Sequence, residues 1–216
     1  MLWRKSRSPS SWRVLKHGTP VHAPLDLQEW LRDTGSLTRK LEEALLYPSD
    51  QHLELKILID HKQNLVGSER EFFQRPLYRS RIREILLCHE GQPIIMARSV
   101  LPITSSIGSN HYILKLGHKP LGAVLFAKDL KGRFRPIREV VRLDHHHPEW
   151  KACKRHFQEL PKRVWARRTL YQLNGHPLLV MEIFLPALQA TLKDMCPLCS
   201  CHHQTMLRIL TLLEND

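Results

Sequence analysis

The sequence lacks any long hydrophobic run. No apolar stretch approaches the roughly 18 residues that a membrane-spanning helix needs, and no apolar segment near the first residue resembles the core of a secretory signal peptide. We therefore expect a protein that does not insert stably into a membrane and that acts in the cytoplasm. The chain also lacks an internal repeat, so a repeat architecture is not expected.

Cysteine is scarce, with five residues in the chain. An odd count without a signal peptide fits a reducing compartment better than a disulfide framework. Three of the five lie close together with a histidine that follows them: Cys196, Cys199, Cys201 and His202. These residue types and spacings occur in zinc sites, but no second Cys/His pair completes an ordinary structural site. A tail with free thiols is the favoured interpretation, and metal binding is the alternative.

What the chain does have is an ordinary globular composition. Its 216 residues are 42% hydrophobic and 25% charged, which argues against a disordered or fibrous protein. This length fits one large domain or two small ones and permits a sizeable core without covalent cross-links.

The charge is unevenly distributed. Lys and Arg number 33 against 21 Asp and Glu, a formal net charge of +12. The excess lies in residues 1–25, with five basic residues and no acid, and in residues 128–176, with thirteen basic and five acidic residues. The rest is nearly balanced. A strongly basic chain suggests a nucleic-acid binder, but no interleaving of aromatic and basic residues supports that class, so no nucleic-acid partner is expected.

Helical patterns occupy the first part of the chain. Residues 1–24 form a basic lead-in without periodicity, typical of a flexible arm, although their composition also resembles that of an organelle transit peptide. From Leu25 onward a helical face emerges. Ser36 is placed to cap a second helix that starts at residue 37.

The residue pattern in the centre of the chain predicts strands. The predicted strands are His52–Ile59, Ile82–Cys88, Pro93–Leu101, Val164–Leu173 and Pro177–Leu185. The second and third flank a short loop with Gly91, and the last two flank Asn174-Gly175, a strong hairpin signal. Residues 116–127 predict a tight turn and a short helix. Consecutive hairpins with helices mainly at one end indicate an α+β domain built on an antiparallel sheet.

Strand alternation places four charges among apolar neighbours: Arg83, Arg98, Arg167 and Glu182. A buried charge is costly without a partner, so these groups should find a counter-ion or a ligand, unless the faces that carry them are solvated. Glu182 is the clearest case, because both faces of its predicted strand are otherwise apolar. A buried Glu tends to have a raised pKa or an Arg partner, which makes it a site candidate.

Several segments in order resemble the chorismate pyruvate-lyases, bacterial enzymes that open ubiquinone biosynthesis. They are Gly35–Leu41, Arg83–Cys88, Ala97–Pro102, Leu116–Gly122, Trp165–Arg168 and Pro177–Ala187. Each string is weak alone, but their order and spacing together are specific. The resemblance covers about residues 26–127 and 163–188.

The resemblance implies a single antiparallel sheet of about six strands with helices over it. It implies a cytosolic monomer that cleaves chorismate to 4-hydroxybenzoate and pyruvate without a cofactor, in an internal cavity under helical flaps. The carboxylate-binding Arg of the family falls on Arg83 and its acidic residue on Glu182, both taken as catalytic. The flap contacts fall on Leu121 and on Leu37, where a member of the family carries Met.

Chorismate is a dianion, so its cavity needs fixed positive charge. Arg83 can grip the ring carboxylate with its planar fork, and Arg98 or Arg167 is expected to hold or balance the second carboxylate. Glu182 is expected to contact the ligand near its C4 oxygen, as a simple contact, an acid or a base.

Two features depart from the family. Residues 128–162 form a basic insertion within the domain at 25–188, expected to be a polar loop, part of which extends a strand. Residues 189–216 form a C-terminal extension that holds the cysteine cluster, and 206–213 are apolar enough for a helix. The alternative function is a non-catalytic, effector-sensing module of the same fold that binds a small aromatic acid.

Overall fold

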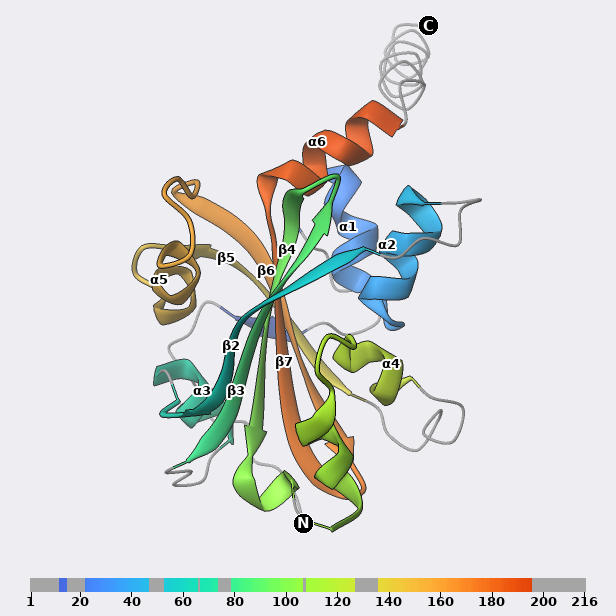
Figure 1. Ribbon diagram of the computed structural model, residues 1–216. Coiled ribbons are helices and arrows are strands. Elements are labelled where there is room, and N and C mark those ends of the chain that lie inside the picture. The colour runs from blue at the N-terminus through green and yellow to red at the C-terminus, as the bar shows by residue number, and fades with distance from the viewer. Residues whose placement is uncertain are drawn as a thin grey trace, which may run out of the picture.

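The computed structural model describes residues 12–14, 22–46, 53–65, 67–73, 79–106, 108–126 and 136–195. Its centre is one antiparallel sheet with the strand order β1-β5-β6-β7-β4-β3-β2 (Figure 1). The strands are β1 (Arg13–Val14), β2 (Glu54–Gln63), β3 (Ser80–His89), β4 (Gln92–Pro102), β5 (Ile137–Asp144), β6 (Arg163–Leu173) and β7 (His176–Phe184). Six long strands and one two-residue strand confirm the predicted α+β class.

Helices cover both faces of the sheet. The α-helices are α1 (Leu25–Arg32), α2 (Leu37–Leu45), α3 (Gly67–Phe73), α4 (Leu121–Leu125), α5 (Pro148–Lys154) and α6 (Pro186–Met195). The 3-10 helices are η1 (Ile103–Ser106) and η2 (Gly108–Lys115). In Figure 1, α1, α2 and α4 lie on one side of the sheet, here named the α2–α4 face, and α3 and α5 lie on the other, the α3–α5 face.

Each face has its own apolar core. On the α2–α4 face, Leu31 and Leu41 of the helices pack with Ile95 and Phe184 of the sheet. On the α3–α5 face, Cys153 of α5 packs with Met96 and Ile183, and Phe73 of α3 packs with Val100. Alternate residues of each central strand thus enter different cores, as the pleat requires. The sheet is therefore buried on both sides at its centre.

Two hairpins close with turns of two residues. Glu90 and Gly91 have φ of 49° and 76°, and Asn174 and Gly175 have φ of 48° and 79°. Positive φ at both central positions defines the turn that matches the twist of the flanking strands. The turn at Asn174-Gly175 was predicted. The earlier loop is shorter than predicted, because β3 and β4 extend through His89 and Gln92.

The segment at 128–162 is more ordered than the predicted polar loop. Residues 137–144 form β5, which pairs with β6 along its whole length, and residues 148–154 form α5. Within the described part of this segment, residues 136–162, the turn at 145–147 and residues 155–162 keep the character of a loop. The predicted strand extension is confirmed by β5, and the helix α5 was not predicted.

Both ends of the domain differ in detail from the expectation. Within the predicted lead-in, Arg13 and Val14 pair with β5, and Trp12 is buried on the α3–α5 face. At the other end, α6 runs across the predicted boundary at 188/189. The candidate ligands Cys196, Cys199, Cys201 and His202 and the predicted helix at 206–213 lie outside the described residues. Among the described helices, none is long and apolar enough to cross a membrane.

Candidate active site

A small internal cavity lies on the α2–α4 face, between the sheet and the helices α2 and α4. Its space measures about 50 Å³. Strands β3, β4, β6 and β7 form its floor and walls, and the first turns of α2 and α4 cover it. Its lining includes Leu37, Arg83, Leu121 and Glu182, the four residues that the sequence resemblance indicated. Residues from four distant parts of the chain therefore meet at one cavity.

The strand register explains why these residues meet. Arg83 of β3 lies opposite Ser99 of β4, and Ala97 of β4 lies opposite Glu182 of β7. Residues opposite one another in an antiparallel pair point to the same face. The small side chains of Ala97 and Ser99 between the two charged residues leave room for the cavity.

Arg83 is nearly buried, with 7% of its side chain exposed. One terminal nitrogen, Nη1, donates to the Asp60 carboxylate at 3.0 Å. The other, Nη2, donates to the carbonyl oxygens of Gly117 at 2.7 Å and Lys119 at 3.3 Å. The guanidinium thus fixes the loop that leads into α4 while it faces the cavity.

Glu182 lies at the other end of the cavity with 13% of its side chain exposed. Arg167 of the neighbouring strand β6 contacts it with two nitrogens, Nε to Oε2 and Nη2 to Oε1, the second at 3.3 Å. The remaining donor group of Arg167, Nη1, contacts the backbone oxygens of Trp30 at 2.6 Å and Asp33 at 2.9 Å. The expectation that Glu182 has an Arg partner is confirmed, and this Arg is fully committed within the protein.

Arg98 does not belong to this cavity. It lies on the α3–α5 face, 1% exposed, between Glu69, whose Oε1 accepts from Nε at 2.7 Å, and Glu84, which accepts from Nη1. The expectation that Arg98 holds the second carboxylate of a ligand at Arg83 is therefore wrong.

The reason is a β-bulge in the hairpin. His89 lies opposite Gln92, but after the bulge Leu87 lies opposite Ile95, so the register moves by one residue. Without the bulge, Arg98 would lie opposite Arg83. With it, Ser99 takes that place, and Arg98 faces Glu84 on the other side of the sheet.

A second bulge brings in a residue that sequence reasoning missed. Between Ile57 and Ile59 the register of β2 shifts, so Asp60 rather than Ile59 lies opposite Arg83 on the α2–α4 face. Burial alone would raise the pKa of Asp60, but the hydrogen bonds and charges of Arg81 and Arg83 outweigh it and hold that pKa below its usual value. Asp60 is thus an ionised partner for Arg83.

Tyr171 and Arg138 were also missed. Tyr171 lines the cavity, and its ring packs edge-to-face on Phe126 at 6.1 Å between centroids. Burial and the charge of Glu182 raise the pKa of its hydroxyl. Arg138 of β5 lies behind this wall with 5% of its surface exposed. Arg138 was missed because β5 lies in the segment expected to be mostly a polar loop. Tyr171 lies in the predicted strand Val164–Leu173, on the same face as Arg167, but only the charged residues of that face were singled out from the sequence.

The two covering helices approach each other closely. Ser36 caps α2, its Oγ accepting from the backbone N–H of Arg39 at 3.4 Å. A Cβ added to Gly122 of α4 would lie 2.8 Å from the same Oγ. Glycine at position 122 therefore permits the packing of α4 on the start of α2.

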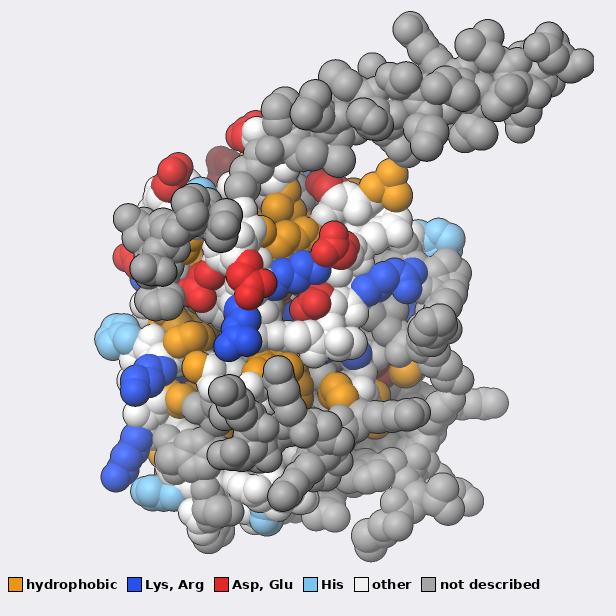
Figure 2. All heavy atoms as spheres, turned by 90° about the vertical axis from the view of Figure 1, so that its right-hand side faces the viewer, with side chains coloured by type: hydrophobic (Ala, Val, Ile, Leu, Met, Phe, Trp, Pro, Cys, Tyr) orange, Lys and Arg blue, Asp and Glu red, His pale blue; other side chains and the backbone are white. Residues whose placement is uncertain are grey.

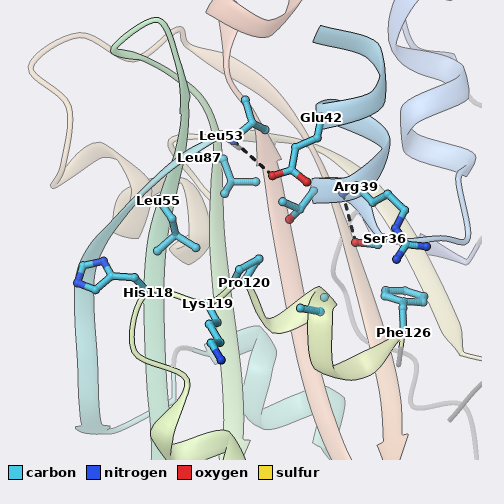
Figure 3. Close-up of a pocket in the computed structure, with 13 residues that line it drawn as sticks. Ser36, Arg39, Glu42, Leu53, Leu55, Leu87, His118, Lys119, Pro120 and Phe126 are labelled. Carbon is cyan, nitrogen blue, oxygen red and sulfur yellow. Dashed lines mark hydrogen bonds between the residues drawn. The ribbon is translucent and has the colours of Figure 1, made fainter. Parts of the chain in front are cut away.

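An outer groove adjoins the cavity at these helices. It measures about 420 Å³ and shares six lining residues with the inner cavity: Ser36, Thr38, Leu87, Pro120, Gly122 and Phe126. Figure 3 shows Lys119 and His118 at its lower edge, and Arg39 and Glu42 of α2 above Phe126. Glu42 also accepts from the backbone N–H of Leu53 at 3.3 Å, which ties α2 to the start of β2. The groove and the inner cavity are therefore contiguous.

The surface around the groove carries both signs of charge. On the face that holds α1 and α2, acidic and basic side chains lie next to one another (Figure 2). Lys40, for example, contacts Glu29 at 2.6 Å and Asp33 at 3.9 Å. In the part of the chain that the structure describes, this face is therefore mixed in charge, unlike the basic tract that a nucleic-acid binder presents.

Comparison with known proteins gives one family. The sequence profile described as chorismate lyase matches residues 13–192. "Chorismate pyruvate-lyase" of Hamiltonella defensa is 33% identical over 182 residues, which cover 82% of this chain and 85% of that protein. The protein of the same name from Yersinia enterocolitica is 31% identical, over 83% and 90%. "Probable chorismate pyruvate-lyase" of Nitrosomonas europaea is 33% identical, over 86% and 98%.

Solved structures show weaker similarity. A GntR-family transcriptional regulator from Bacillus cereus is 14% identical with a TM-score of 0.46, over 62% of this chain and 92% of that chain. The C-terminal domain of the histidine utilization repressor from Pseudomonas syringae is 14% identical with a TM-score of 0.43, over the same shares. Similarity at this level carries no argument about function.

Proposed function

Because the chain belongs to the chorismate lyase family, we propose that it is a lyase that converts chorismate to 4-hydroxybenzoate and pyruvate. The observation that carries the proposal is the convergence of Arg83 and Glu182, with opposite charges, on one cavity. A cavity with a fixed positive charge at one end and a carboxylate at the other fits a ring that bears a carboxylate on one side and a hydroxyl on the other.

The proposed reaction is a redox-neutral elimination. The C4–H bond of the ring breaks, its electron pair forms the C3–C4 double bond, and the C3–O bond breaks with its pair on the departing oxygen. The enolpyruvate released takes up a proton and becomes pyruvate, while the ring becomes 4-hydroxybenzoate. Atoms and electrons balance without an oxidant or reductant, so the proposal includes no cofactor. Aromatisation supplies most of the driving force, which leaves positioning and charge stabilisation to the protein.

Each site residue has a proposed role. Arg83 holds the ring carboxylate, and the backbone N–H groups of Leu37 and Leu121 add donors, since each residue begins a helix whose first N–H groups have no intrahelical partner. Glu182 contacts the C4 side of the ring, where the proton leaves. Arg167, which contacts both oxygens of Glu182, orients that carboxylate.

The setting of the activity is part of the same proposal. We place the reaction in the cytoplasm, as the first step of ubiquinone biosynthesis, carried out by a monomer without a nucleic-acid partner. The inner cavity of about 50 Å³ adjoins the outer groove beneath the first turns of α2 and α4, which is the proposed route of access.

The test is direct. The purified chain is incubated with chorismate. Formation of 4-hydroxybenzoate is followed by absorbance, pyruvate is measured in a separate assay, and the two products should form in equal amounts. Formation of both products is the expected result. The second candidate, an aromatic-acid-binding module, is favoured instead if 4-hydroxybenzoate binds tightly and no product forms. Absence of both binding and turnover contradicts both functions.

A further inference from the structure

Two arginines lie at opposite ends of one row across the sheet. The row runs through residues that lie opposite one another in successive strands: Arg83, Ser99, Val180, Thr169 and Arg138. Four steps of roughly 4.8 Å separate the ends by about 19 Å along the sheet. All five side chains leave the sheet on the α2–α4 face, and Ser99 and Val180 line the cavity between the arginines. This face thus offers positive charge on two sides of the cavity.

One donor nitrogen of Arg138 makes no hydrogen bond within the described residues. Its Nε donates to the Thr169 hydroxyl at 3.0 Å, and its Nη1 donates to the backbone oxygen of Asp33. Its Nη2 is buried and has no hydrogen-bond partner among the described residues. A buried guanidinium nitrogen without an acceptor is costly, and negative charge bound near this position would offset part of that cost.

The charge around Arg138 is also unbalanced. The carboxylate of Glu182 is held by Arg167. Among the described residues, the hydrogen bonds of Arg138 go to a hydroxyl and a backbone oxygen and include no carboxylate. Burial and the charge of nearby Arg167 lower the pKa of Arg138 from its usual value, the mark of a cation in an unfavourable place. Guanidinium stays protonated in proteins, so the imbalance is relieved by an anion rather than by loss of a proton.

Tyr171 connects Arg138 with the cavity. Tyr171 lies two residues after Thr169 on the same face of β6, and it lines the cavity while Arg138 lies behind it. The charge of Arg138 lowers the pKa of the Tyr171 hydroxyl, against the larger effect of burial, which places the two groups near each other. A hydroxyl beside a guanidinium is a good donor to an anionic ligand.

We propose that Tyr171 and Arg138 recognise the second anionic group of a dianionic ligand, which in chorismate is the enolpyruvyl carboxylate. Tyr171 contacts the ligand, and Arg138 is a positioning residue that orients the hydroxyl and supplies charge behind it. This inference rests on the proposed function and assigns to Arg138 the second positive charge that the sequence had placed on Arg98 or Arg167.

The assignment has a consequence for selectivity. The enolpyruvyl carboxylate is present in the substrate and absent from 4-hydroxybenzoate. Tyr171 and Arg138 therefore strengthen substrate binding alone, whereas Arg83 acts on both molecules through the carboxylate that they share.

The experiment compares KM for chorismate with the inhibition constant for 4-hydroxybenzoate. For Tyr171→Phe, which keeps the ring on Phe126, KM should rise about 3- to 10-fold; for Arg138→Met it should rise about 10- to 100-fold. The inhibition constant should stay within about twofold in both. Arg138→Lys, which keeps the charge, should recover part of the loss.

A merely structural role predicts a different pattern. Arg168→Met is the matched control, since it removes an equally buried arginine from the α3–α5 face, and it should leave the ratio of the two constants unchanged. Equal changes in both constants for the Tyr171 and Arg138 variants, or no change in KM, overturn the inference. If Arg138→Met does not fold, Tyr171→Phe decides alone.

Failure of the proposed function is recognised separately. If the wild-type chain binds chorismate without turnover, the dissociation constants of chorismate and 4-hydroxybenzoate replace the kinetic constants. A selective loss of chorismate binding then supports the inference although the lyase proposal has failed. If the wild type binds neither molecule, both are overturned.

Discussion

Arg83 differs from two other buried arginines, Arg98 and Arg167, in the kind of partner that it holds. Arg98 and Arg167 each make two contacts with one carboxylate. Arg83 instead shares the Asp60 carboxylate with Arg81, and its Nη2 donates to backbone carbonyls. Neutral carbonyls are weaker acceptors than a carboxylate. A ligand carboxylate can therefore displace them with a net gain, which suits Arg83 to binding rather than to permanent structure.

Replacement of Arg83 by Ala should reduce the affinity for 4-hydroxybenzoate by about tenfold or more, and the turnover of chorismate with it, because a charge-assisted contact is lost. The affinity can be measured by titration calorimetry. Arg81→Ala is the control, since Arg81 shares Asp60 at 2.5 Å but does not line the main cavity. Near-wild-type turnover and product affinity in Arg83→Ala contradict the proposed placement.

Replacement of Glu182 by Gln keeps the shape of the side chain and removes its charge. We expect kcat to fall at least tenfold, and by about 10²–10⁴-fold if Glu182 moves the proton. Stopped assays over a range of pH measure the change. Glu84→Gln is the matched control, because Glu84 is also a buried partner of an arginine but lies on the α3–α5 face. If Glu182→Gln keeps the turnover rate and the ligand affinity of the wild type, Glu182 is only a partner of Arg167.

At the scale of elements, the contact between α2 and α4 lies at the cavity, where residues of both helices line it. In Gly122→Ala the new methyl group would lie 2.8 Å from the Ser36 Oγ that caps α2. The two helices must separate slightly, so we expect 4-hydroxybenzoate to dissociate several-fold faster with little loss of thermal stability. Stopped-flow measurement of product release tests this.

Gly35→Ala is the matched control for that variant, because its added Cβ would meet Asp33 at an ordinary distance of 3.5 Å. It should leave product release unchanged. Equal rates in wild type and Gly122→Ala would show that this contact does not limit release.

The elements that the sequence predicted well are those with strong local signals. The hairpin at Asn174-Gly175, the cap at Ser36 and the alternation of the central strands depend on neighbouring residues alone. The two β-bulges are different, since each depends on packing between strands. The bulge in β2 places Asp60 opposite Arg83, and the bulge in the β3–β4 hairpin turns Arg98 to the other face of the sheet. Arg138 could not be foreseen for a related reason, because β5 becomes a strand by pairing with β6.

At the scale of the whole molecule, the two faces of the sheet use charge differently. The α2–α4 face gathers charge around a cavity, whereas the α3–α5 face uses it to hold its helices. Glu69 of α3 binds Arg98, and Arg168 binds Glu139 at 2.6 Å with its guanidinium on the rings of Trp12 and Phe72. In the latter case a charge is buried in contact with both a carboxylate and aromatic rings, which lowers the cost of burial.

Glu149 of α5 gives this second face a dependence on pH. Burial raises the pKa of Glu149, and its Oε2 has no partner among the described residues. The folded state therefore keeps the proton more readily than the unfolded state, whose value is near 4.5. This contribution to stability is present below that value and is lost as the pH rises through the folded-state pKa.

Glu149→Gln should abolish this loss. Between about pH 4.5 and neutrality, the free energy of unfolding should fall less in the variant than in the wild type, as measured by urea unfolding. Asp60→Asn tests the opposite sign, because the lowered pKa of Asp60 stabilises the fold above about 3.8 and this effect disappears in acid. Parallel stability curves for wild type and Glu149→Gln would contradict the prediction.

The pairing of β4 with β7 joins segments about 80 residues apart in the chain, while β3–β4, β5–β6 and β6–β7 join neighbours in sequence. Ala97, Ser99, Val180 and Glu182, which floor the cavity, all lie on this one long-range pairing. Contacts of high sequence separation form late in folding, because a large loop must close first. The binding site therefore comes into being only as the two halves of the sheet assemble, and a bound ligand favours the fully assembled chain by mass action.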